Sequence, residues 1–236
     1  MWLKATKLQD FYCSNIGKVA QRIIGAKLRT LLPDVKGQRI LGLGFANPYL
    51  EIFGDDAGQI LAAVPYCSGI TCWRPEGSTM TISASELELP FLDLSLDIVV
   101  IIHALEYTGD TRIMLREVWR VLSDTGRLVV VVPNRHGLWS RVNKTPFGYG
   151  RPFSKAQILQ VLDESLFTPI RTFQSLFVPP FESRLFLSSS NAIEVVGQYL
   201  AFGVSGVIIS YATKQIYSAT LLPEMTSKRK YAAIVE

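Results

Sequence analysis

Apolar residues in this chain fall into two patterns: short uninterrupted runs and longer stretches at helical spacing. Four runs rich in Val, Ile and Leu lie at residues 39–44, 59–64, 97–104 and 127–132. Such runs are typical of strands that are buried on both faces of a sheet. Between the last two, apolar residues recur every three or four positions from Met114 to Leu122, after a capping residue at Asp110 or Thr111. This spacing predicts a helix, and strands that alternate with helices predict a parallel α/β sheet.

The rest of the chain extends this pattern on both sides. Residues 1–32 are predicted to be helical, with an apolar stripe from Phe11 to Leu31 that ends before Pro33. A helix over 48–53 and a short strand over 80–84 complete the first half. After a loop rich in Gly and aromatic residues, we expect further elements in the order helix, strand, helix, strand, at 154–166, 170–178, 191–201 and from 206 onward.

One segment, Ile193 to Tyr211, approaches the length and hydropathy of a membrane-spanning helix. Glu194, Gln198 and the glycines within it favour instead a packed helix, a turn and a buried strand. We therefore expect no transmembrane segment.

Composition limits the class of protein. Of the 236 residues, 48% are hydrophobic and 19% charged, which excludes a disordered chain and supplies a core for one large domain. The net charge of +4 permits an anionic partner without requiring one. Two histidines exclude a His-rich metal centre, and the three cysteines lack metal-ligand spacing, so no metal site is expected. The amino terminus lacks the order of a signal peptide, from which we expect a cytoplasmic protein.

The segment from Leu89 to Asn134 resembles the centre of class I S-adenosylmethionine (SAM)-dependent methyltransferases, in the group with the type-11 methyltransferase domain. The resemblance rests on LPFLDLSLDIVVIIHALEYTGD and on LREVWRVLSDTGRLVVVVPN, and it extends over residues 37–135. It implies an α/β, Rossmann-like seven-stranded sheet, mostly parallel with the last strand antiparallel, and helices on both faces. It also implies one domain, residues 1–236: a lid or packing segment (1–33), a cofactor-binding half (37–135) and a substrate-side half (136–236).

The cofactor motif of that family is altered here. The family pattern ILDLGCGTG aligns with Ile40 to Pro48, so that Gly44 keeps the first glycine and Gly42 replaces the acidic residue. The end of the second strand, residues 64–68, lacks the family's other carboxylate. Each charge-assisted hydrogen bond contributes roughly 1.5 to 3 kcal/mol, so both losses would weaken SAM binding unless other groups compensate.

The resemblance nevertheless implies a set of cofactor contacts. These residues are Gly42, Gly44, Phe45, Asn47, Pro65, Glu86, Leu87 and His103. We expect six of them, all except Gly42 and Leu87, to line one cleft beyond the carboxyl ends of the strands, with His103 in that pocket rather than in the core.

Methyl transfer from a sulfonium requires alignment, exclusion of water and, for a hydroxyl or protonated amine, one base. His103 and Glu106, at the end of a strand, are the candidate catalytic residues. Candidate substrate contacts follow the next strand: Asn134, Arg135, His136, Tyr149 and Arg151. Residues 133–136 lack the Asn-Pro-Pro-aromatic signature of enzymes that methylate bases or glutamine amides, which favours a small-molecule acceptor and no nucleic-acid partner.

Two alternatives remain. The altered motif is also compatible with a catalytically silent relative that kept the sheet and serves as a binding or regulatory partner. A nicotinamide-dependent enzyme is disfavoured, because Asn47 stands where the G-x-G-x-x-G fingerprint requires its third glycine.

Overall fold

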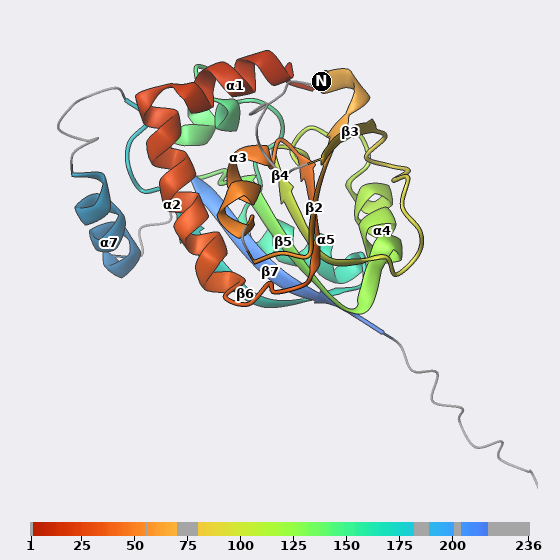
Figure 1. Cartoon of the computed structure of the whole chain (residues 1–236). Helices are drawn as coiled ribbons and strands as arrows, with labels where there is room; N and C mark the ends of the chain where they lie inside the picture. The colour runs from red at the N-terminus through yellow and green to blue at the C-terminus, as the bar shows by residue number, and fades with distance from the viewer. Residues whose placement is uncertain (1, 55, 70–79, 182–188, 201–203, 217–236) are drawn as a thin grey trace, which may run out of the picture.

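A seven-stranded sheet in the order β3-β2-β1-β4-β5-β7-β6 is the central element of the computed structural model (Figure 1), which describes residues 2–54, 56–69, 80–181, 189–200 and 204–216. The strands are β1 (Arg39–Gly44), β2 (Gln59–Pro65), β3 (Met80–Ala84), β4 (Leu96–Ile102), β5 (Leu122–Pro133), β6 (Phe167–Ser175) and β7 (Val207–Lys214). β7 pairs antiparallel with both β5 and β6, and the remaining pairs are parallel. The predicted sheet, with its last strand antiparallel, is confirmed.

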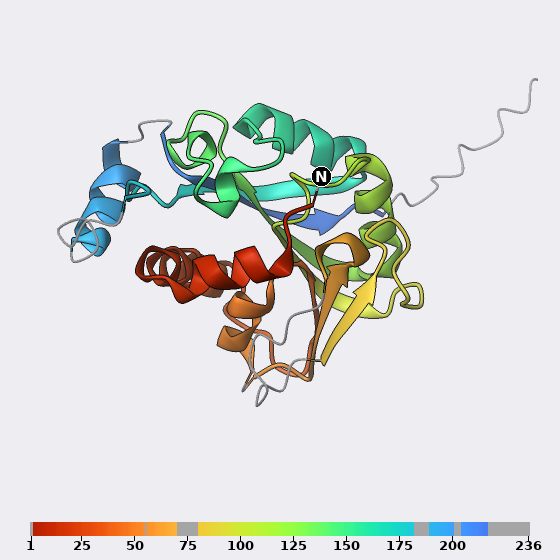
Figure 2. The same ribbon diagram turned by 90° about the horizontal axis from the view of Figure 1, so that it is seen from above.

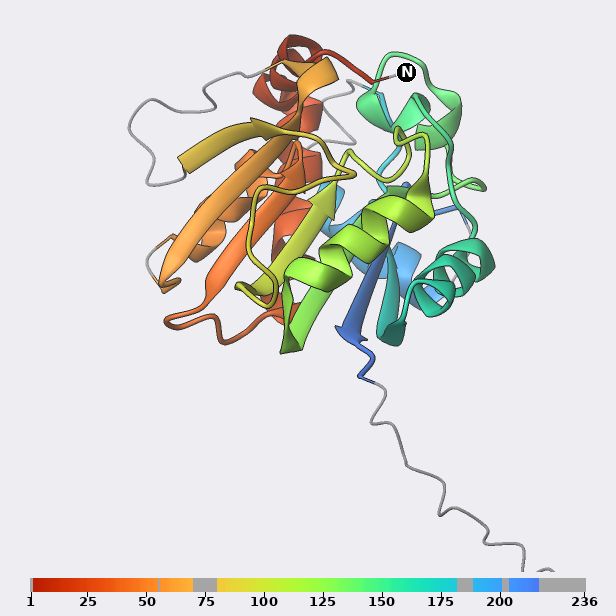
Figure 3. The same cartoon turned by 90° about the vertical axis from the view of Figure 1, so that its right-hand side faces the viewer.

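Helices cover both faces of this sheet (Figures 2 and 3). The helices are α1 (Ala5–Cys13), α2 (Asn15–Leu31), α3 (Asn47–Leu50), α4 (Thr111–Val121), α5 (Lys155–Glu164) and α7 (Ser190–Leu200). Apolar side chains of α1, α2 and α3 form one core with one face of the sheet, whereas those of α4 and α5 form a second core on the other face. Because the sheet is covered on both sides, its central strands are almost entirely apolar.

The amino-terminal segment was predicted as one helix and is two. The chain turns at Ser14, whose hydroxyl accepts a hydrogen bond from the Gly17 amide and so caps α2. Gly17 lies against the end of α1, where a Cβ would come within 1.9 Å of the Phe11 carbonyl oxygen. The turn lets α1 run across the carboxyl ends of the strands while α2 packs along the sheet (Figure 1).

The apolar segment near the carboxyl terminus forms α7 and β7, as the helix–turn–strand prediction required. Within the part of the chain that the structure describes, no helix has both the length and the hydropathy needed to cross a bilayer. Of the three cysteines, Cys13 and Cys67 are exposed free thiols, and Cys72 lies outside the described residues.

Candidate functional site

The tight turn after β1 depends on Gly44. Its φ is +92°, and a Cβ at this position would lie 2.3 Å from the carbonyl oxygen of Ile102 in β4. The next residue, Phe45, donates its amide to that same oxygen over 2.8 Å. Only glycine combines this backbone conformation with such a close approach, so the residue shapes the strand-to-helix turn.

Two positions away, Gly42 lies in a filled environment. A Cβ there would meet the Leu50 side chain at 2.6 Å and the Ala46 methyl group at 2.7 Å. These apolar groups occupy the place where the family carries its acidic side chain. Because Leu50 and Ala46 leave no room for a side chain, only the backbone of Gly42 could meet a cofactor, and this contact stays a prediction.

The end of β4 carries a buried row of polar side chains. His103 has a φ of +53°, an uncommon conformation for a residue other than glycine, and its imidazole Nδ1 lies 3.1 Å from Glu106 Oε1. On its other side Nε2 lies 2.7 Å from the Tyr12 hydroxyl, to which Tyr49 donates over 2.8 Å. His103 is 2% exposed, so it is buried in this structure, and its place in a cofactor pocket stays a prediction.

The hydrogens in this row can be assigned from its chemistry. The Tyr12 hydroxyl accepts from Tyr49, so its own proton is available for His103 Nε2. Nε2 then accepts, and the imidazole proton lies on Nδ1, facing Glu106 Oε1. Burial raises the pKa of Tyr12 well above its ordinary value of 10.0, and the neighbouring Tyr49 and Glu106 add to the effect. Burial likewise raises the pKa of Tyr49. Both tyrosines therefore stay protonated at neutral pH and act as donors, not as bases.

Tyr12 closes this site from above. It belongs to α1, and its ring stacks on Phe45 with 5.8 Å between centroids and 14° between planes. It thus joins the amino-terminal helix to the turn after β1 and to the end of β4. In this position the ring covers the strand ends where the family resemblance implies the amino-acid end of SAM.

Two oxygen atoms around the strand ends are buried and have no hydrogen-bond partner among the described residues: Asn47 Oδ1 and Glu106 Oε2. A buried acceptor without a donor costs roughly 1 to 3 kcal/mol, more if it is charged. Both atoms are therefore suited to a ligand that brings N–H or O–H donors.

The ends of β2 and β3 are more open. Tyr66, directly after β2, is 67% exposed, and the Asn47 amide nitrogen donates to Thr81 of β3 over 3.1 Å. Glu86 is half-buried and accepts a 3.4 Å hydrogen bond from Thr108, and the half-buried Leu87 donates its amide to Ser85. No cleft is described here, so the predicted common cleft stays a prediction, although its residues do gather along one edge of the sheet.

The five predicted substrate residues separate in the structure. Asn134 is buried and structural, because its amide donates to Ser205 and accepts from the His136 backbone. Its substrate contact stays a prediction. Arg135 and His136 are exposed on the rim, and Arg151 donates to the Thr108 carbonyl. Only Tyr149 of these five lines the cavity described next.

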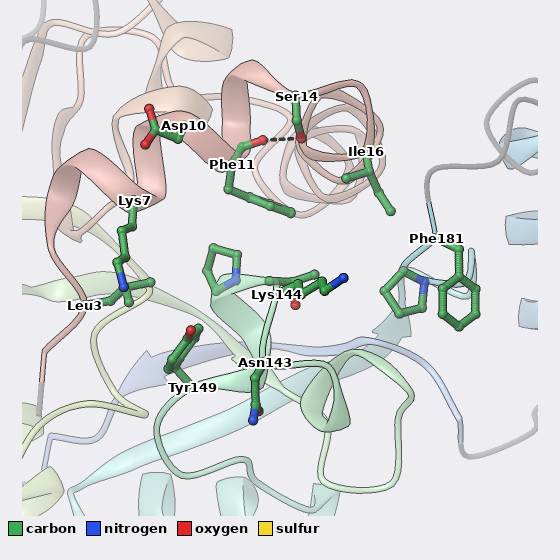
Figure 4. Close-up of a pocket in the computed structure, with 13 residues that line it drawn as sticks. Leu3, Lys7, Asp10, Phe11, Ser14, Ile16, Asn143, Lys144, Tyr149 and Phe181 are labelled. Carbon is green, nitrogen blue, oxygen red and sulfur yellow. Dashed lines mark hydrogen bonds between the residues drawn. The ribbon is translucent and has the colours of Figure 1, made fainter.

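A cavity of about 800 Å³ lies between α1 and the loop that follows β5 (Figure 4). Its wall on the helix side includes Phe11, the neighbour of Tyr12. Phe147 separates it from the buried row, with ring centroids 6.0 Å from Phe11 and 4.8 Å from His103. The cavity and the His103–Glu106 pair are therefore neighbours on either side of one aromatic layer.

Sequence reasoning missed the residues that α1 contributes. Tyr12 and Phe11 stand in an apolar stripe that any packing helix would show, and Lys7 is one of several scattered lysines. No local signal distinguishes them, because their role depends on the break at Ser14.

The comparisons with known proteins agree with this architecture. Residues 44–130 match the family model described as a methyltransferase domain. The chain has the class I methyltransferase fold. Its methyltransferase domain match contains the turn after β1, the His103–Glu106 pair and α4, which is the part that the sequence motifs indicated.

Three relatives illustrate the breadth of this similarity. A SAM-dependent methyltransferase of Thermotoga maritima, described as a possible histamine N-methyltransferase, superposes with a TM-score of 0.57 at 16% identity, over 89% of this chain and 91% of that one. Geranyl diphosphate C-methyltransferase of Streptomyces coelicolor, solved with S-adenosylhomocysteine (SAH), gives 0.58 at 14% identity over 80% and 74%. The uncharacterized protein YafS of Escherichia coli strain K12 is 40% identical over 55 residues, which is 23% of each protein's length.

Proposed function

We propose that this protein is a SAM-dependent methyltransferase that acts on a small-molecule acceptor. The observation that carries the proposal is the buried row at the end of β4, inside the matched methyltransferase domain and next to a large cavity. A polar, partly unsatisfied site beside a ligand-sized cavity is a strong candidate for chemistry.

The residues present fit SAM through groups other than those of the family motif. Bound there, SAM would supply an activated methyl group for direct displacement. Asn47 Oδ1 and Glu106 Oε2 are acceptors without donors and would accept hydrogen bonds from its amino or hydroxyl groups. Glu86, half-buried beyond β3, would meet the adenine end, as the resemblance implies.

The base in this proposal is His103. Glu106 fixes the imidazole with its proton on Nδ1, and Nε2 is then free to accept a proton from an acceptor hydroxyl or protonated amine. In the present arrangement Tyr12 occupies Nε2. Reaction therefore requires α1 to move so that Tyr12 leaves Nε2. To exclude water, α1 would then have to cover the site in a second position that keeps Tyr12 off the imidazole.

A specific observation favours a second candidate, the catalytically silent relative. Tyr12 stacked on Phe45, together with Leu50 and Ala46 against Gly42, fills the region of the missing acid with protein side chains. If α1 never opens, the same site is a permanent core and the protein serves as a binding partner.

Calorimetric titration with SAM and SAH separates these candidates. The proposal predicts micromolar binding to the wild type, lost or weakened at least tenfold in Glu106→Leu provided that this variant remains folded by circular dichroism. Glu164→Leu, an exposed carboxylate on α5, serves as the matched control and keeps wild-type affinity. Absence of binding at millimolar SAM in a folded wild type would establish the silent relative.

A further inference from the structure

The 800 Å³ cavity between α1 and the loop after β5 has a lining that indicates one class of ligand (Figure 4). Its volume falls in the range of cavities that hold drug-sized molecules. Leu3, Phe11 and Ile16 supply an apolar wall on the helix side, and Pro146 and Phe181 supply one on the other side. A ligand here would bury an apolar body of about one or two rings.

The charged residues of the lining indicate a second property of the ligand. Lys7 of α1 and Lys144 of the facing loop both line the cavity, from opposite sides. Within the described residues neither lysine forms a salt bridge. Asp10 also belongs to the lining, but Figure 4 shows its carboxylate directed to the far side of α1, whereas Lys7 extends down toward Leu3 and Tyr149. The cavity is therefore basic where a ligand would lie.

The neutral polar groups of the lining add no charge to the cavity. The Ser14 hydroxyl is used within the helix break, where it donates to the Phe11 carbonyl and accepts from the Gly17 amide. Asn143 and Tyr149 are exposed at the rim and can donate or accept. A negative group beside either lysine would gain an attractive partner, while a positive group there would be repelled.

We infer that this cavity binds the acceptor substrate, and that the acceptor is a mainly apolar, ring-sized molecule carrying an anionic group. The assignment rests on the proposed function for calling the ligand an acceptor, whereas its chemistry rests on the cavity alone. Phe11 and Phe147 then form the boundary between the acceptor and His103. Movement of α1 would remove Phe11 and Tyr12 together, because they are consecutive residues of one helix. Phe147 belongs to the loop after β5 and would have to turn aside as well to join the cavity to the imidazole.

The test uses four ligands of one shape on the full chain, with affinities from titration calorimetry. They are 1-naphthoate, 1-naphthyl phosphate, 1-naphthylmethanol and 1-naphthylmethylamine. The two anions should bind several times more tightly than the alcohol, and the amine should bind most weakly. The carboxylate and phosphate arms show which anionic group the two lysines prefer.

Variants then place the binding in this cavity. Lys7→Gln and Lys144→Gln should each weaken binding of the anions by about two- to fivefold and leave the alcohol unchanged. Lys4→Gln is the matched control, because this exposed lysine precedes α1, makes no side-chain cap and does not line the cavity. Equal affinity for the alcohol and the anions, a preference for the amine, or anion binding that ignores both lysines would overturn the inference.

The two proposals fail separately. Both lysine variants should keep wild-type affinity for SAM, because neither residue belongs to the buried row. Lysine-dependent anion binding in a protein that binds no SAM would refute the methyltransferase proposal and leave the ligand class standing. SAM binding without any preference for the anions would refute the ligand class and leave the methyltransferase proposal standing.

Discussion

The two ends of the candidate cofactor site differ in how far protein side chains fill them. At the ends of β1 and β4, Tyr12, Phe45 and His103 are buried against one another, and Gly42 has no room for a side chain. At the ends of β2 and β3, Tyr66 is largely exposed and Glu86 is half-buried. The family resemblance assigns the first region to the methyl-bearing end of SAM and the second to its adenosine end.

At the closed end, the altered motif and the amino-terminal helix meet at the turn after β1. Losing the acid at Gly42 leaves a space that Leu50 and Ala46 fill, and the turn beyond it becomes the surface on which Tyr12 stacks. At the ends of β2 and β3, the polar side chains Tyr66 and Glu86 are more exposed than those beneath Tyr12. Whether the protein binds SAM thus depends on how readily α1 leaves the closed end.

The largest effect is expected from removing the imidazole at the closed end. His103→Ala would leave the Glu106 oxygen and the Tyr12 hydroxyl buried without a partner, at roughly 1 to 3 kcal/mol for each group, and would also leave a cavity. We therefore expect a loss of about 3 to 5 kcal/mol in the free energy of unfolding. Urea denaturation at pH 7 measures this loss, and adding Glu106→Gln should restore part of it. Glu86→Gln at the open end should change the free energy of unfolding by less than about 0.5 kcal/mol. Equal losses in the two variants would contradict the difference in burial between the two ends.

Two glycines with positive φ, one at each end of the candidate cofactor site, allow the ends to be compared by backbone substitutions. Gly44→Ala combines an unfavourable φ with a 2.3 Å clash against Ile102, so we expect it to cost about 3 kcal/mol or more. Gly69→Ala, after β2, has a φ of +77° and no described atom within 4 Å of the new Cβ. It should cost about 1 to 3 kcal/mol from its backbone conformation alone, and less than Gly44→Ala, which adds the clash. Thermal unfolding followed by circular dichroism checks both values. A mild Gly44→Ala would mean that the turn is looser than the structure shows.

Removing the Tyr12 hydroxyl tests whether α1 acts as a lid over the site. Tyr12→Phe removes the hydrogen bonds to His103 and from Tyr49, and should lower stability by about 1 to 2 kcal/mol. If α1 covers the SAM site, the same variant should bind SAH more tightly than the wild type in a calorimetric titration. Tyr107→Phe, which loses a buried hydrogen bond to the Pro146 carbonyl, is the control: similar destabilisation and unchanged affinity. Equal SAH affinity in both variants would count against the lid.

The smallest effect lies at the opposite ends of β1 and β4, away from the site. The Arg39 guanidinium hydrogen-bonds Asp97 and lowers the pKa of that carboxyl. A lowered folded-state pKa adds stability above the unfolded value of about 4, and this stability is lost as the pH falls through the folded pKa. Both groups are partly exposed, so Asp97→Asn should cost under about 1 kcal/mol at pH 7 and less at pH 2. Urea unfolding at the two pH values measures it, and an equal loss at both would exclude the ion pair as its cause.

Much of the fold could be predicted because its signals are local. The apolar runs give β1 and β3 with their observed bounds, and Asp110 caps α4 as expected. Gly44 and the strand-end positions of His103 and Glu106 likewise follow from motif spacing. The break at Ser14 could not be predicted, since it depends on Gly17 packing against the Phe11 carbonyl. The break places α1 over the end of β4 and so buries His103. The burial of His103 could therefore not be predicted from the sequence either.

Amide hydrogen exchange of the full chain, with and without millimolar SAH, tests most directly whether the strand ends beneath α1 bind the cofactor. The account predicts altered exchange in peptides that cover α1 and residues 44–47, with no change in α5 on the opposite face of the sheet. Exchange that is identical with and without SAH in all these peptides would contradict it.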